Sequence, residues 1–213
     1  MASIPIIILI AIASHLLPIL VGFKGRIHLL CIIPLVSFAF DVLITVLKRG
    51  MGINSQWLGN LFLPAEFILV SLLYQKYVLK ARPSLFFLFM LCMCLGFIVH
   101  TSINSAAVLN KFGGSAFYFT YMLYSMLGFY MILKKQDVIH IERSWKFWTN
   151  VTFLLYASGD FFLLLFAGYL KKTYPDFYTA LWQNVWLTLT IVKNLLLGIA
   201  VYYYNKSERL ESS

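Results

Sequence analysis

Seven long apolar segments, joined by short polar loops, occupy nearly all of the 213 residues of this chain. Helical runs of about 17 to 25 apolar residues match the thickness of the hydrocarbon core of a bilayer. Because lipid offers the backbone no hydrogen-bond partner, each run must satisfy its N–H and C=O groups within itself. The sequence therefore predicts an all-α integral membrane protein, a bundle of seven transmembrane helices.

The polar loops set the boundaries of the expected helices. These helices cover residues 4–21, 27–47, 58–78, 84–100, 116–133, 147–170 and 180–204. No stretch between them is long enough to bury a separate soluble core, so residues 1–213 are expected to form one transmembrane domain. The run Ala11-Ile12-Ala13 resembles a signal-peptide cleavage site, but no basic residue precedes it, and we expect a retained first helix.

The net charge of +9 is carried almost entirely by the loops, where it acts as a topology signal instead of a nucleic-acid site. Eleven Lys and Arg residues follow the first, third, fifth and seventh segments, and five lie on the other side. The positive-inside rule then predicts an N-terminus outside and a cytoplasmic C-terminus. Aromatic residues expected at the inner boundary include Trp145, Trp148 and Tyr74.

Four ionisable residues lie inside apolar segments: Asp41, Glu66, Asp160 and Lys193. A charge at this depth costs about 2.5 kcal/mol or more, so each residue needs a partner or a function. With a rise of about 1.5 Å per residue, the three acids are expected in the outer half of the bilayer and Lys193 near its middle. We therefore expect a polar cavity that opens to the outside.

Polar residues extend this set along helix faces. Steps of three and four residues place Tyr156 with Asp160, and Trp186 with Thr190, Lys193 and Asn194. The predicted residues for ligand or proton binding are Asp41, Glu66, Asp160, Lys193, Tyr156, Trp186, Thr190, Asn194 and His15, with Tyr121 and Tyr124 as further walls.

The pattern also fits an internal repeat. The second and sixth segments each carry one acid, and the third and seventh each carry one charged residue, whereas the fourth carries none before His100. Two three-helix halves joined by the fourth helix would produce this arrangement. Chance similarity among apolar segments is the alternative.

A purely structural explanation of the charges is that Lys193 pairs with Asp160 or Glu66 as a clasp between helices. One cation cannot neutralise three anions, so at least one acid would then be protonated or hydrated. This surplus favours a functional site with shared protons or a bound ligand.

Two functions suit such a site. The favoured one is a small-ligand receptor or accessory sensing module that signals through a cytoplasmic or membrane partner protein. The other is a proton-coupled transporter of a small solute, which the repeat would support.

No catalytic residue, metal site or cofactor is predicted. The four histidines contain no HxxxH pair, and the three cysteines lie in apolar segments. A lysine in the last of seven helices is typical of retinal proteins, but Leu189 stands where those proteins carry an Asp four residues before the lysine.

Several short motifs carry a family resemblance: Trp57 with Asn60 and Glu66, Ser144-Trp145-Lys-Phe-Trp148, Leu155-Tyr156-Ala-Ser158, and Lys193-Asn194-Leu-Leu. In these residues the chain resembles small, mostly uncharacterised seven-helix inner-membrane proteins of Bacteroidota-type bacteria. The resemblance implies an inner-membrane location and association with signalling proteins. The fourth segment, rich in Phe and Met, presents either a homodimer face or a lipid-facing surface.

Overall fold

The computed structural model describes residues 6–22, 29–79, 82–104, 109–134 and 140–211, and all regular structure in these ranges is helical. Six helices are long and apolar enough to cross a membrane: Leu29–Gly50, Gln56–Leu79, Pro83–Asn104, Lys111–Lys134, Trp145–Thr173 and Asn184–Ser207. The apolar helical stretch Ile6–Gly22 is shorter. The all-α fold and the membrane character are thus confirmed, with six helices of spanning length instead of seven.

The elements follow one another in a simple order. They are α1 (Ile6–Ser14), α2 (Leu16–Gly22), α3 (Leu29–Thr45) with the π-helical end η1 (Val46–Gly50), α4 (Gln56–Leu73) with η2 (Tyr74–Leu79), α5 (Pro83–Asn104), α6 (Lys111–Lys134), the short η3 (Ile141–Arg143), α7 (Trp145–Thr173), α8 (Pro175–Leu181), η4 (Trp182–Trp186) and α9 (Leu187–Glu211).

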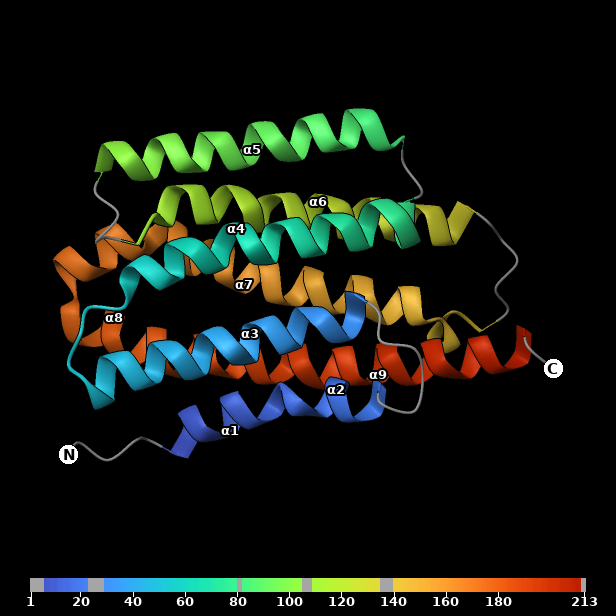
Figure 1. Ribbon diagram of the computed structural model, residues 1–213, viewed down its shortest axis with the longest axis horizontal. Coiled ribbons are helices and arrows are strands. Elements are labelled where there is room, and N and C mark those ends of the chain that lie inside the picture. Colours follow the sequence, from blue (N-terminus) through green and yellow to red (C-terminus); the bar gives the residue numbers. More distant parts are fainter. Residues whose placement is uncertain (1–5, 23–28, 80–81, 105–108, 135–139, 212–213) are drawn as a thin grey trace.

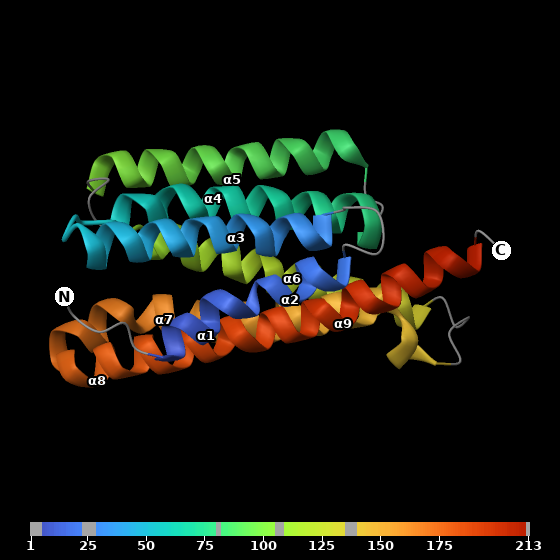
Figure 2. The ribbon, with the colours of Figure 1, turned by 60° about the horizontal axis from the view of Figure 1, so that its bottom comes forward.

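The long helices run up and down along a common axis (Figure 1). α1 begins and α9 ends at opposite ends of the bundle. α9 packs against α7, α1, α2 and α3, and α4 packs against α3, α5 and α6. Figure 2, turned from the first view, again shows α5 as the outermost layer, which agrees with its largely exposed apolar surface.

The first apolar segment is broken at His15, between α1 and α2. Pro18 explains the break, because it has no N–H group to donate to the carbonyl of Ser14 one turn earlier. The backbone N–H of His15 instead donates to Ile12, three residues back, over 3.3 Å. The polar residues Ser14 and His15 lie at this break, in the middle of the segment.

Two expected helix starts were too late. α6 begins at Lys111 instead of residue 116, because Asn110 caps it: the Gly113 N–H donates to the Asn110 side-chain oxygen over 2.9 Å. The last segment begins its helix at Pro175 instead of residue 180, and proline is well suited to a first helical position. The last helix continues to Glu211, seven residues beyond its expected end, and the other described ends differ by one to four residues. The expected starts at residues 4 and 27 lie outside the described residues.

Asn110 also joins three helices. Its backbone N–H donates to Asn60 of α4 over 2.8 Å, and its side-chain amide donates to the Phe97 carbonyl and the Thr101 hydroxyl of α5. Since these groups are buried, each bond replaces one that water would otherwise supply. Asn110 thereby fixes the start of α6 against α4 and α5.

Aromatic rings form the centre of the bundle. Phe67 of α4 stacks on Phe117 of α6 at 4.2 Å between centroids, and Phe97 of α5 stacks on the same Phe117 at 5.0 Å. Tyr74, expected at the membrane boundary, is instead fully buried, and its hydroxyl lies 2.9 Å from the Ser125 hydroxyl. The Ser125 bond satisfies the phenol without water, which is why this tyrosine can lie in the core.

Candidate functional site

Lys193 and Glu66 form a buried ion pair between α9 and α4. The lysine Nζ lies 3.0 Å from Glu66 Oε1, and each side chain is only 2% exposed. The same ammonium lies 4.1 Å from the centre of the Tyr156 ring on α7, within cation–π range. A charge on α9 is thus held by an anion from one helix and an aromatic face from another.

Asp160 is the second buried acid, one turn after Tyr156 on α7. It lies within electrostatic reach of Lys193 and Glu66 but forms no ion pair within the described part of the chain. Neither of its oxygens accepts a hydrogen bond of ordinary geometry, and the Tyr156 hydroxyl approaches as a weak donor. An unpaired buried polar group is costly, so Asp160 calls for a proton, a water or a ligand.

The hydroxyl of Tyr156 lies 3.2 Å from that of Tyr118 on α6. This phenol pair continues the polar surface around Lys193 onto α6, the fourth helix of the site. We refer to Glu66, Asp160, Lys193 and Tyr156 together as the charged centre.

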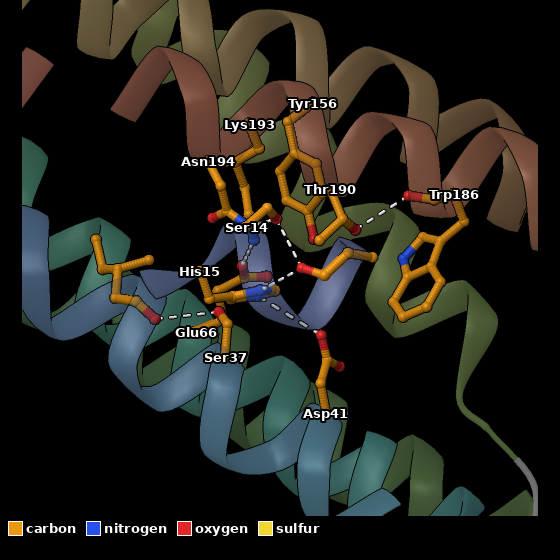
Figure 3. Close-up of polar contacts among 12 residues, drawn as sticks. Ser14, His15, Ser37, Asp41, Glu66, Tyr156, Trp186, Thr190, Lys193 and Asn194 are labelled. Atoms are coloured by element: carbon orange, nitrogen blue, oxygen red, sulfur yellow. Dashed lines mark hydrogen bonds and ion pairs between the residues drawn. The ribbon is translucent and has the colours of Figure 1, made fainter. Parts of the chain in front are cut away.

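His15 and Asp41 lie next to the charged centre (Figure 3). Nε2 of His15 is 3.5 Å from Asp41 Oδ2, and Nδ1 is 3.0 Å from the Ala11 carbonyl. A carbonyl only accepts, so Nδ1 carries a proton and donates to Ala11. Nε2 then has no proton in the neutral ring, and the contact with Asp41 is favourable only if one further proton lies between the two side chains.

Asn194 and Thr190 complete the polar face of α9. The Asn194 amide donates to Ser14 over 2.8 Å, which ties α9 to the break in the first segment. The Thr190 hydroxyl donates to the Trp186 carbonyl of its own helix over 3.0 Å. Thr190 is therefore bonded within its own helix, and Asn194 joins α9 to the first segment.

The structure gathers most of the predicted site residues but not all. Glu66, His15, Lys193 and Asn194 converge, whereas the ring of Trp186 lies apart from them (Figure 3). That ring stacks on Trp182 at 6.2 Å between centroids. Trp186 is therefore a residue of the helix end and not a contact of Lys193.

The two tyrosines that were predicted as further walls of the site lie in different parts of the core. Tyr121 packs beside Tyr118, near the charged centre, while Tyr124 packs against Tyr74 and Phe86 elsewhere in the core.

Sequence reasoning missed Tyr118 and Ser14. Tyr118 starts a series of phenols that continues with Tyr121 and Tyr124 at steps of three, and this spacing was a readable signal for one helix face. Ser14 could have been found through Pro18, which predicts a break beside it.

The charged centre is enclosed in this conformation. Lys193, Glu66 and Asp160 are buried, and Asp41 is the most open of the charged side chains at 17% exposure. A solute would therefore reach the centre only after a side chain or helix moves. Among the described residues, no group of three or more His, Cys, Asp and Glu side chains lies close enough to hold a metal ion.

Comparisons of the chain with models of known protein families, with curated proteins and with solved structures found no match. The function must therefore be inferred from the chemistry of the charged centre.

Proposed function

We propose that this protein is a receptor-like or accessory sensing protein of a bacterial inner membrane, which binds a small ligand at the charged centre. The observation that carries the proposal is Asp160, a buried acid without a firm hydrogen bond, next to the Lys193–Glu66 ion pair. Buried titratable groups with unmet bonding capacity are typical of binding and proton-transfer sites.

A structural clasp explains these residues less well. Lys193 and Glu66 alone would join α9 to α4 with no net charge. Asp160 adds a third ionisable group at a desolvation cost and contributes no described ion pair in return. A ligand or proton that binds there would supply the missing compensation.

Ligand entry and signalling fit the expected topology. With the N-terminus outside and the shorter stretch Ile6–Gly22 counted as the first crossing, the end of the bundle at α8 faces outward and α9 ends in the cytoplasm. A helix shift on binding would be transmitted to the basic cytoplasmic loops, where a signalling protein would read it. The resemblance to seven-helix proteins of Bacteroidota-type bacteria supports such a partner.

Proton-coupled transport of a small solute is the second candidate, and the break between α1 and α2 favours it. Transporters often place discontinuous helices beside their binding site. Here Ser14 and His15 at the break contact Asn194 and Asp41. The π-helical turn η4, just before Thr190, is a second irregularity of the kind found at functional sites. Two three-helix halves around a peripheral α5 would suit this mechanism as well.

A solute screen tests the proposed binding. The purified protein in detergent is heated with a library of small solutes, and its unfolding temperature is compared with that of Asp160→Asn. Asp176→Asn, the same change at an exposed position of α8, is the matched control. We expect a solute that stabilises wild type and the control but not Asp160→Asn.

The same solute then separates the two candidates. Proteoliposomes that accumulate it, or that move protons when it is added, would indicate transport. Binding without flux supports the sensing function. If no solute stabilises the wild-type protein, binding at the charged centre is refuted.

A further inference from the structure

We propose that the ligand of the charged centre is a small organic cation that carries an ammonium group. This inference rests on the proposed binding function and adds the chemical class of the ligand.

The buried acids around Lys193 outnumber the buried cations. Asp160 and Asp41 each interact through space with Glu66 and with Lys193. Lys193 is the single Lys or Arg among the buried residues of the described chain, and Glu66 already holds it. An anionic ligand would meet an excess of carboxyl groups and no unoccupied cation, whereas a cationic ligand would balance that excess.

Three buried carboxyl oxygens of the site lack a hydrogen-bond donor in ordinary geometry. Glu66 Oε2 and both carboxyl oxygens of Asp160 are buried and accept no hydrogen bond of ordinary geometry. Carboxylates only accept hydrogen bonds, and apart from the weak Tyr156 donor near Asp160 these three atoms lack the donors that they can accept from. An ammonium group brings up to three N–H donors together with the compensating charge, and such charge-assisted bonds are the strongest that a carboxylate forms.

The site already accommodates one ammonium group, that of Lys193. Lys193 Nζ lies between the Glu66 carboxyl group, 3.0 Å away, and the face of the Tyr156 ring, 4.1 Å away. A carboxylate combined with an aromatic face is the usual way in which proteins recognise organic cations. Asp160, one turn from Tyr156 on α7, provides a second carboxyl group beside the same ring.

The experiment compares probes that differ in charge and hardly in size. Ethylammonium, ethanol, acetamide and acetate are titrated separately into the purified full-length protein in detergent, at constant ionic strength, and thermal unfolding is recorded. Ethylammonium is expected to stabilise wild type at concentrations about tenfold lower than its neutral analogues, a factor that corresponds to one charge-assisted contact. Its effect should disappear in Asp160→Asn and persist in Asp176→Asn.

A second variant protects the test if Asp160→Asn does not fold. Lys193→Ala vacates the position of the ammonium group, and butylammonium should then restore part of the lost thermal stability, while butanol should not. Rescue by butylammonium shows that a free cation reaches and occupies the site, and equal rescue by both probes would contradict the proposal.

The outcomes separate the cation proposal from the binding proposal. If acetamide or acetate stabilises wild type and loses its effect in Asp160→Asn, the centre binds a ligand of another class, and only the cation proposal fails. If none of the probes stabilises wild type and no solute of the wider screen does so either, both proposals fail.

Discussion

The ammonium group of Lys193 is held between Glu66 and Tyr156, at 3.0 Å from the carboxylate oxygen and 4.1 Å from the ring centre. The three residues come from α9, α4 and α7, so the contact joins helices that are far apart in the sequence. The charge is compensated locally, which allows a lysine to lie in the middle of an apolar helix. Asp160 beside it is the group that this contact leaves uncompensated.

Replacing Lys193 alone should destabilise the protein strongly. Lys193→Met leaves the Glu66 carboxylate buried without its cation, and breaking such a pair typically costs about 3 to 5 kcal/mol. Thermal or denaturant unfolding in detergent measures the loss. Lys172→Met, at an exposed position of α7, is the control and should change stability by less than about 0.5 kcal/mol. A Lys193→Met protein as stable as this control would show that Glu66 is neutral or already compensated.

The His15–Asp41 contact should make stability depend on pH. Nδ1 of His15 donates to Ala11, so a favourable contact between Nε2 and Asp41 needs one bound proton. We expect the folded protein to hold this proton. Losing it as the pH rises leaves two acceptors facing each other, so this contribution to stability should be present at acidic pH and lost at alkaline pH.

Asp41→Asn should remove that pH dependence. The asparagine amide can donate to Nε2 without a titrating proton, so its stability should stay level across the range in which wild type weakens. Unfolding temperatures measured from acidic to alkaline pH for both proteins provide the comparison. Parallel pH profiles would show that no shared proton lies between His15 and Asp41.

Gly128 should tolerate no side chain. A methyl group at this position would clash with the Asn150 carboxamide of α7, which is fully buried. Gly128→Ala is therefore expected to cost about 1 to 3 kcal/mol through overpacking. Gly96→Ala on the exposed face of α5 has no atom within 4 Å of the new methyl group and should be neutral or slightly stabilising. Equal effects of the two substitutions would contradict the close packing of α6 on α7.

Asn110 should be a major fixed point of the bundle. Asn110→Ala removes the cap of α6 and the two amide bonds to α5, with an expected cost of about 2 kcal/mol or more. The control is Asn104→Ala, because that asparagine is exposed and bonds within its own helix. Thermal unfolding compares the two variants. An Asn110→Ala protein as stable as Asn104→Ala would show that Asn110 does not fix the start of α6 against α4 and α5.

Much of the fold could be predicted from hydropathy because a bilayer allows few solutions. Long apolar runs must be helical, and the cost of buried charge predicts that Glu66, Asp160 and Lys193 face inward, where the structure indeed buries them. The length of the first helix could not be judged in this way, because the apolar run continues through the break at His15.

The details of the site depended on how the helices pack. Periodicity does not say which acid meets Lys193, because Glu66 and Asp160 lie on helices whose rotation is set by contacts such as the stack of Phe67 on Phe117. Tyr74 shows the same limit: its place near the end of an apolar run indicated the membrane boundary, but the bond to Ser125 keeps it in the core. Local sequence cannot reveal a partner fifty residues away.

The most direct measurement of ligand binding at the charged centre uses a variant that keeps the fold and lacks the Lys193–Glu66 ion pair. Lys193→Met combined with Glu66→Met replaces the buried ion pair by apolar side chains of similar volume, a change that is often neutral or stabilising. We predict that this double variant unfolds within about 1 kcal/mol of wild type but shows no stabilisation by ethylammonium or by any solute that stabilises wild type. A double variant that responds to that solute as wild type does would contradict binding at the charged centre.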